Sequence, residues 1–274
     1  MITNYKYKPT FYFILAFAIT WIHGFIIAAQ SHHGADKNLI ILLLTYMGPY
    51  IAALIMMFAF NDKAFRADFR KRIYNLKLIK KSYIPFTLFF LPITMVISIL
   101  ISIAFGQPSE QLRFAEEFKI FNGEVILSMI ILVLVPLLEE LGWRGYGVDS
   151  LASKFNLFKT SMIFGALWSV WHLPAFFIKN SYQASLWGQH PLFAVNFFIG
   201  IFPMAIIINY LYYRNRRSIF IVALFHVLVN YSSELFEANQ VSKCILTIVL
   251  SVVAVIIIMQ NKNYFFKDKM IEVS

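Results

Sequence analysis

The sequence has few charged residues: only 14% of its 274 positions are Asp, Glu, Lys or Arg, whereas an ordinary soluble domain has about 25%. Hydrophobic residues make up 59% of the chain and aromatic residues 18%. This composition excludes an ordinary soluble globule. Because a membrane-spanning helix needs about 20 apolar residues, the hydrophobic content is enough for about eight such helices.

The chain also lacks the features of two other classes of protein. It has a single cysteine, Cys244, so an internal disulfide bond is excluded. It lacks the alternation of polar and apolar residues typical of membrane barrels, and has unbroken apolar runs such as 39–44 and 245–259. No internal repeat, low-complexity tract or second domain is visible. The sequence therefore predicts an all-α polytopic membrane protein with one transmembrane domain over residues 1–274.

The apolar runs between charged clusters predict eight transmembrane helices, near residues 10–29, 39–60, 83–105, 124–146, 160–178, 192–213, 218–236 and 243–260. If the N-terminus is cytoplasmic, 19 of the 24 lysines and arginines fall in cytoplasmic segments. This is the asymmetry of the positive-inside bias, so we expect both termini in the cytoplasm. The net charge of +10 is then explained by orientation, and the expected partner is the lipid bilayer, not nucleic acid.

Two further sets of residues are expected near the membrane surface. Residues 64–79 place four apolar side chains at helical spacing among basic ones, which fits either a helix lying on the anionic inner leaflet or a solvated basic loop. Several aromatic residues are expected to be interfacial anchors, the usual position of such rings: Trp143, Trp171, Trp187, Tyr210, Tyr212 and Tyr213.

A first polar cluster interrupts the fourth predicted helix near its cytoplasmic end. An ionisable side chain at the centre of a span costs about 2.5 to 3.5 kcal/mol, so its default interpretation is functional. Glu140 and Arg144 are four residues apart and can neutralise each other on a helix. Glu139 points about 100° away and is left without that local partner. Taken alone, an adjacent pair of glutamates at a helix end would usually be a surface pair.

Two more clusters lie in the fifth and seventh predicted helices. Trp168 and His172 share one helix face, as do His226 and Asn230. Alone, each could be a satisfied polar group or interhelical glue. Helical rise places Glu139, His226 and His172 about 7, 12 and 18 Å inside the cytoplasmic edge of the bilayer core. Helix tilt could close this spread, and the side chains could then converge in one cavity that opens toward the cytoplasm.

These clusters resemble the motifs of the CAAX-protease and bacteriocin-processing family of intramembrane endopeptidases, also called the ABI family. Glu139, Glu140 and Arg144 match its E-E-x-x-x-R motif. Trp168 to His172 matches F-x-x-x-H with Trp in place of Phe, and His226 to Asn230 matches H-x-x-x-N. The matched region covers residues 124–231. The resemblance implies a prokaryotic membrane peptidase whose site lies inside the bilayer, opens to the cytoplasm and acts on a membrane-associated protein or peptide.

The same residues suggest a hydrolytic chemistry. Peptide hydrolysis needs an activated water, a stabilised oxyanion and a proton for the leaving amine. We hypothesise that Glu139 is the general base and that His172 holds the water. His226 and Asn230 would then donate to the oxyanion. The Glu140–Arg144 pair would position Glu139, although the resemblance permits a more direct role for Glu140.

Two alternatives stay open at this point. One is a zinc enzyme with Glu139, His172 and His226 as ligands, since two histidines and a glutamate are a known catalytic set, although the chain has no H-E-x-x-H pair. No cofactor is firmly predicted, and zinc is the possible one. The other is an immunity scaffold or transporter that uses the same polar cavity without hydrolysis. No inverted repeat is evident, which weakens the transporter interpretation.

Overall fold

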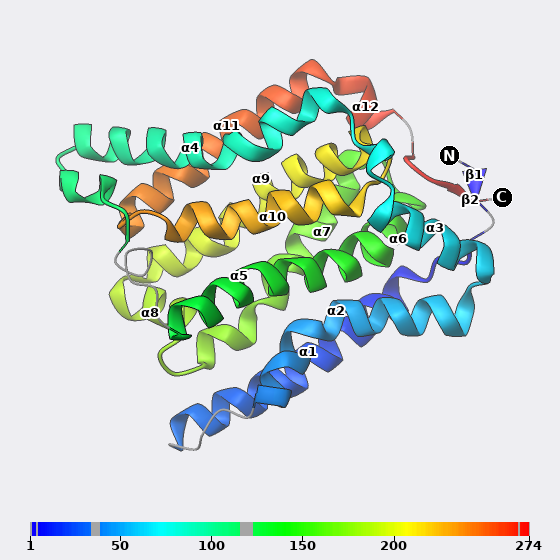
Figure 1. Cartoon of the computed structure of the whole chain (residues 1–274), viewed down its shortest axis with the longest axis horizontal. Coiled ribbons are helices and arrows are strands. Elements are labelled where there is room, and N and C mark those ends of the chain that lie inside the picture. The colour runs from blue at the N-terminus through cyan, green and yellow to red at the C-terminus, as the bar shows by residue number, and fades with distance from the viewer. Residues whose placement is uncertain (1, 4, 34–38, 116–122, 268, 274) are drawn as a thin grey trace.

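The computed structural model describes residues 2–3, 5–33, 39–115, 123–267 and 269–273. Its long helices correspond to the eight predicted segments: α1 (Pro9–His32), α2 (Leu39–Phe60), α4 (Ile84–Ala104), α5 (Gly123–Gly142), α7 (Leu157–Trp171), α9 (Pro191–Arg214), α10 (Ile219–Glu234) and α11 (Gln240–Gln260). They run roughly along the long axis of the molecule (Figure 1). The predicted all-α architecture is therefore confirmed.

The remaining elements are short. They are the helices α3 (Lys63–Tyr74), α6 (Val148–Ala152), α8 (Tyr182–Gln189) and α12 (Lys262–Phe266), the π-helical segment Trp143–Gly147, and the 3₁₀ turns Leu76–Leu78, Lys81–Tyr83, Ser109–Leu112 and Leu173–Phe177. Strand β1 (Ile2–Thr3) pairs in parallel with β2 (Glu272–Val273), so two segments from opposite ends of the sequence lie side by side.

A full membrane crossing needs a helix of about 20 apolar residues. Five in the described part of the chain are long and apolar enough: Pro9–His32, Ile40–Phe60, Lys81–Ala104, Pro191–Arg214 and Gln240–Gln260. A sixth crossing is possible if Leu157–Phe177 and Tyr182–Gln189, bent by 83°, count as one broken span. Helix α10 has only 16 residues, fewer than the roughly 20 that cross a bilayer. The chain is an integral membrane protein with five or six such candidate spans.

Side-chain caps explain where several helices begin. The carboxylate of Asp62 accepts from the backbone N–H of Phe65 at the start of α3, and the amide oxygen of Asn156 accepts from Lys159 at the start of α7. Asn239 caps α11 in the same way through Ser242. Each cap satisfies one backbone donor that the first helical turn leaves free.

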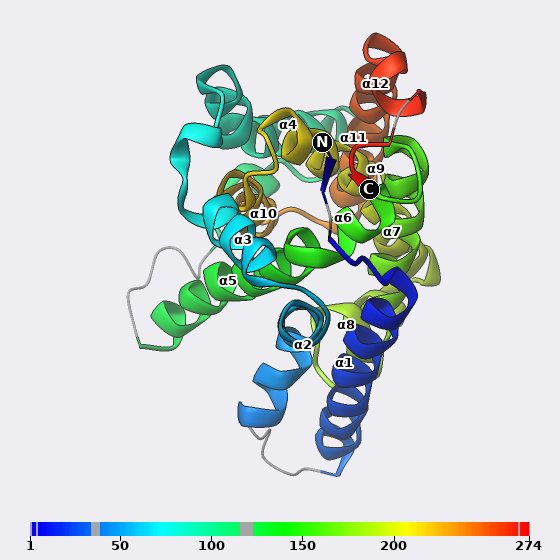
Figure 2. The ribbon, with the colours of Figure 1, turned by 90° about the vertical axis from the view of Figure 1, so that its right-hand side faces the viewer.

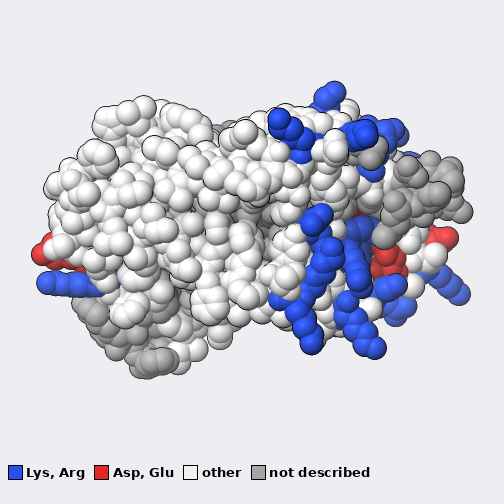
Figure 3. Space-filling model, turned by 90° about the horizontal axis from the view of Figure 1, so that it is seen from above, with Lys and Arg blue, Asp and Glu red and all other residues white. Residues whose placement is uncertain are grey.

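Both termini lie at one end of the molecule with α3, α6 and α12 (Figures 1 and 2). Lysine and arginine gather at the same end (Figure 3), and their exposed members there include Lys63, Arg70, Lys71, Lys77, Lys80, Lys81, Arg216, Lys262, Lys267 and Lys269. We call this the basic end.

Helix α3 (Lys63–Tyr74) at the basic end covers most of the segment for which a surface helix or a basic loop is expected. Phe65 and Phe69 are buried, and Phe65 contacts the rings of Tyr5 and Tyr146. These two apolar side chains therefore pack on the protein itself, whereas Leu76, beyond the end of α3, is exposed. Arg72, on the same helix, is also buried.

Candidate active site

Glu139 lies near the C-terminal end of α5 and is buried, with 5% of its surface exposed. Its Oε2 accepts hydrogen bonds from the indole N–H groups of Trp168, at 3.2 Å, and Trp143, at 3.4 Å. Trp143 is four residues further along the chain, so Glu139 has a local hydrogen-bond donor, although not a neutralising partner such as Arg144 is for Glu140. Two uncharged donors hold this carboxylate without neutralising it, which leaves its charge available for chemistry.

Glu140 and Arg144 form the ion pair that their spacing predicts. Nη1 of Arg144 lies 2.7 Å from each carboxylate oxygen of Glu140, and both residues are fully buried. Nη2 of Arg144 donates to the amide oxygen of Asn209 on α9 at 3.0 Å, and the amide nitrogen of Asn209 donates to Ser161 at 3.1 Å. Sequence reasoning missed Asn209, although an asparagine inside an apolar run was a usable signal.

The two histidines are each held through Nδ1. Nδ1 of His172 lies 2.7 Å from the carbonyl oxygen of Trp168, and Nδ1 of His226 lies 2.9 Å from Oε1 of Glu140. Because a carbonyl or carboxylate oxygen only accepts, each Nδ1 must carry the proton. Nε2 of each ring is then free for a water molecule or a substrate. Helix α7 ends at Trp171, so His172 lies at the helix boundary, just before Pro174.

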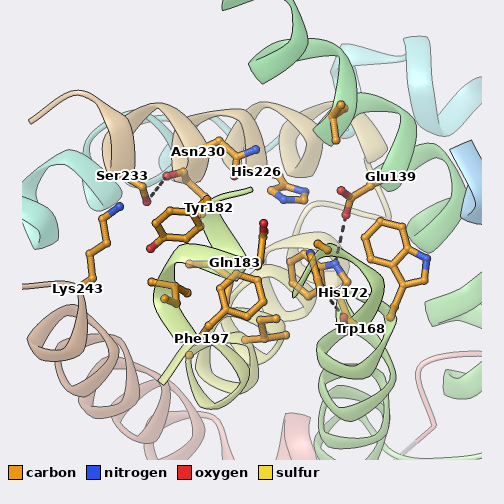
Figure 4. Close-up of a pocket in the computed structure, with 18 of the residues that line it drawn as sticks. Glu139, Trp168, His172, Tyr182, Gln183, Phe197, His226, Asn230, Ser233 and Lys243 are labelled. Atoms are coloured by element: carbon orange, nitrogen blue, oxygen red, sulfur yellow. Dashed lines mark hydrogen bonds between the residues drawn. The ribbon is translucent and has the colours of Figure 1, made fainter. Parts of the chain in front are cut away.

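One cavity of about 480 Å³ connects these groups. Glu139, His172, His226 and Asn230 all line it, as Figure 4 shows. Glu140 and Arg144 do not line it and act on it only through His226 and the fold of α5. The structure thus brings four of the six predicted site residues to one surface and places the other two directly behind it.

The cavity extends to both sides of Glu139 and His172. On one side its lining comes from α1 and α2, through Thr20, Thr45 and Tyr46. On the other side the lining comes from α8, α10 and α11, as far as Lys243. A chain that crosses the site can therefore continue in two directions, as the substrate of an endopeptidase must.

The exposed lining residues are Ile131, Tyr182 and Glu234, the last two at the end of the molecule remote from the basic end. The sequence predicts cytoplasmic termini and a cavity that opens to the cytoplasm. In the structure the termini lie at one end of the molecule, whereas α8, which contains Tyr182, and the C-terminal end of α10, which contains Glu234, lie toward the other (Figure 1). If the cavity opens at Tyr182 and Glu234, the termini and this opening cannot both face the cytoplasm.

The segment after the two glutamates is π-helical and tightly packed. Arg72 on α3 donates to the backbone oxygens of Arg144, at 2.6 Å, and Gly145, at 3.0 Å. A Cβ on Gly142 would lie 2.3 Å from the backbone carbon of Pro49 on α2, so only glycine allows this close approach. Trp143 and Trp171 are buried here, and the prediction that they are interfacial anchors is wrong. Instead, the indole N–H of Trp143 donates to Glu139, and Trp171 lines the cavity.

The arrangement of the side chains in the site bears on the zinc alternative. No group of three His, Cys, Asp or Glu side chains in the described residues is arranged so that it could hold a metal ion. By this criterion Glu139, His172 and His226 do not form a zinc site.

Comparison with known proteins agrees with the site. A family model described as Type II CAAX prenyl endopeptidase Rce1-like matches residues 121–232, which contain all three motifs. The chain is 39% identical over 269 residues to CAAX prenyl protease 2 of Methanococcus maripaludis, covering 97% of this chain and 99% of that protein. The chain belongs to the Rce1-like CAAX prenyl endopeptidase family. Membership confirms the resemblance seen in the motifs and supports endopeptidase activity inside the membrane.

A second relative is more distant from this chain. Lysostaphin resistance protein A of Staphylococcus haemolyticus is 25% identical over 195 residues, covering 69% of this chain and 47% of that protein. Within the family, this chain has Trp168 where the motif has Phe. The structure explains why an indole is useful there, since its N–H donates to Glu139.

Proposed function

We propose that this chain hydrolyses a peptide bond of a membrane-associated protein or peptide, with Glu139 activating the attacking water. The observation that carries the proposal is the arrangement of Glu139, His172 and His226 around one buried cavity. Family membership supports a protease, and the names of the relative and of the family model suggest the substrate: a protein with a C-terminal Cys-a-a-X motif, in which the cysteine is prenylated.

The roles follow from which atoms are free. Nε2 of His172 accepts a hydrogen bond from one O–H of the water and so holds it in place. Glu139 removes the proton of the other O–H as the resulting hydroxide attacks the carbonyl carbon. The amide N–H of Asn230 donates to the oxyanion without any change of protonation. His226 can donate there only when both ring nitrogens carry protons, with Glu140 as its counter-charge. Protonated Glu139 finally returns its proton to the leaving amine.

The test is a cleavage assay on purified protein with a prenylated Cys-a-a-X peptide, read by mass spectrometry. Glu139→Gln keeps an oxygen acceptor for both indoles but removes the base, so the rate should fall by a factor on the order of 10² to 10⁴. Glu110→Gln is the control, because Glu110 is exposed in a surface turn. Undiminished cleavage by Glu139→Gln would rule out this base. Addition of a chelator separates the zinc alternative, since the metal-free mechanism predicts an unchanged rate.

We also propose how the chain lies in its membrane. It forms one domain of eight membrane-embedded helices, of which the short α7 and α10 line the site, in a prokaryotic cell membrane. Both termini are cytoplasmic, which the concentration of lysine and arginine at the basic end supports (Figure 3). A substrate then reaches Glu139 from the membrane interior or the far side, in place of the cytoplasmic opening expected from the sequence.

Cysteine labelling with an impermeant reagent tests this orientation in a Cys244→Ser background. A cysteine at Arg70 should react only from the cytoplasmic side, and a cysteine at Glu234 only from the opposite side. Labelling of position 234 from the cytoplasm would reverse the orientation and restore a cytoplasmic opening.

A further inference from the structure

Lys243 lies at the far end of the cavity from Glu139 (Figure 4). Among the described residues that line the cavity, it is the only lysine or arginine. Its side chain is 15% exposed, so much of its hydration has been lost. A cation in a largely apolar cavity needs compensation, and a ligand that supplies negative charge would provide it.

The partners of Lys243 in the structure are weak. Its Nζ lies 4.6 Å from the centroid of the Tyr182 ring and 3.7 Å from Oε1 of Glu234, which is longer than a hydrogen bond. The side chain of Glu234 is 51% exposed, and ion pairs of this kind contribute about 0 to 1 kcal/mol. A carboxylate that enters the cavity can therefore replace Glu234 at little cost.

The separation between the two ends matches a short peptide. His226 and Glu234 are eight residues apart on α10, which is about 12 Å along the helix axis. Extended chain covers about 3.3 to 3.6 Å per residue, so three or four residues fit between the reacting groups and Lys243. Asn230, Gln183 and Ser233 lie along this path and offer polar groups to a peptide backbone.

We infer that Lys243, at the end of the cavity remote from Glu139, is the side chain that binds the terminal carboxylate of the substrate. The upstream part of the substrate then leaves on the other side of Glu139, along the lining from α1 and α2. This inference rests on the proposed function and names the part of the substrate that the far end of the cavity recognises. It agrees with a motif in which cysteine is followed by three terminal residues.

Two peptides that differ only at the C-terminus test the inference, one ending in a free carboxylate and one in a carboxamide. The wild-type protein should cleave the acid with a kcat/KM about tenfold or more above that for the amide, because only the acid forms a charge-assisted contact. Lys243→Met should lower kcat/KM for the acid to the value for the amide and leave the amide unchanged, which also shows that the variant is folded. Lys243→Arg should keep most of the preference.

Lys179→Met is the matched control, because Lys179 is exposed just before α8 and outside the cavity lining. It should cleave both peptides as the wild type does. Equal cleavage of both peptides by the wild type, or an equal loss on both with Lys243→Met, would overturn the carboxylate site while Glu139-dependent cleavage keeps the proposed function. Absence of cleavage of either peptide would instead contradict the proposed function, and this inference with it.

Discussion

The protein buries two clusters of charge that look alike but differ in what they face. The cavity cluster consists of Glu140, Arg144, His226 and Asn209. The basic-end cluster consists of Asp149, Arg72, Arg217, Asp68, Tyr212 and Tyr213. In both clusters the central carboxylate, that of Glu140 or Asp149, is fully buried and bound to arginine.

The difference lies in where each cluster ends. The cavity cluster ends at His226, whose ring lines the cavity. The basic-end cluster reaches the backbone oxygen of Arg144 through Arg72 and Tyr212, but Asp149, Tyr212 and Tyr213 do not line the cavity. Buried charge alone therefore does not indicate a reactive site. A residue that connects the charge to a cavity does.

The basic-end cluster keeps its charge over a wide pH range. Burial opposes the charged form of Arg217, but Asp149 and the groups around it outweigh burial and raise the pKa of Arg217 well above its usual value. The pKa of Arg72 is also raised: burial lowers it, but Tyr212, Asp149 and Asp68 outweigh that effect. Both guanidinium groups therefore stay charged, and the carboxylate of Asp149 compensates them.

The largest effect is expected at Glu140, because its carboxylate contacts His226 in the lining of the cavity. Glu140→Ala removes the partner of both Arg144 and His226, so it should lower cleavage about 10- to 100-fold, the usual cost of losing a group that orients a histidine. It should also lower the free energy of unfolding by about 3 to 5 kcal/mol, because Arg144 is left buried and unpaired. Cleavage kinetics and unfolding in detergent measure the two effects. A variant that loses stability but keeps full activity would remove the distinction between the clusters.

The next effect separates stability from chemistry. Asp149→Ala leaves Arg72 and Arg217 without their shared carboxylate, which should lower the free energy of unfolding by about 3 to 5 kcal/mol. The fraction that remains folded, measured below the unfolding midpoint, should cleave within a few-fold of the wild-type rate. A hundredfold loss per folded molecule would mean that this cluster also acts on the site.

A smaller effect is expected at the outer contact of the cavity cluster. Asn209→Leu removes the hydrogen bonds of Asn209 to Arg144 and Ser161 and should cost about 1 to 3 kcal/mol of stability. The bidentate contact of Arg144 with Glu140 remains, so cleavage should fall only slightly. A loss of activity as large as that of Glu140→Ala would show that Asn209, not Glu140, sets the position of Arg144.

The smallest effect is expected at Tyr213, in the basic-end cluster. Tyr213→Phe removes one hydrogen bond to Asp149, at 2.9 Å, and should lower the free energy of unfolding by about 1 kcal/mol without changing cleavage. Thermal unfolding in detergent and the peptide assay test both statements. A change in kcat would contradict the view that this cluster is purely structural.

Local spacing was sufficient to predict the helices and the motif residues. The apolar runs predict eight segments, and each corresponds to a long helix. The four-residue spacing of Glu140 and Arg144 predicts their ion pair, which the structure contains. These features depend on periodicity along one helix, which the sequence displays directly.

Contacts between distant segments could not be predicted in this way. Trp168 donates to Glu139 from 29 positions away, and Arg72 binds the backbone of Arg144 from 72 positions away. The sequence predicts only that Trp168 shares a helix face with His172 and that Arg72 lies in a basic segment, so neither contact could be inferred from the residue type. A run of apolar residues also does not reveal that α10 has only 16 residues in its helix, so the number of full crossings stays a prediction.

The π-helical segment Trp143–Gly147 sets how the two clusters are rotated relative to each other about the helix axis. Glu140 precedes this segment, and Asp149 follows it in α6 without a break in the helix. Such a segment arises when a helix accommodates one extra residue. Deleting a single residue within it would return the segment to the regular α-helical ladder and remove one side chain from this tightly packed stretch. Substitutions are equally constrained, because Arg144 pairs with Glu140 and a Cβ on Gly145 or Gly147 would lie 2.8 Å from the ring of Phe69 or 2.6 Å from that of Tyr12.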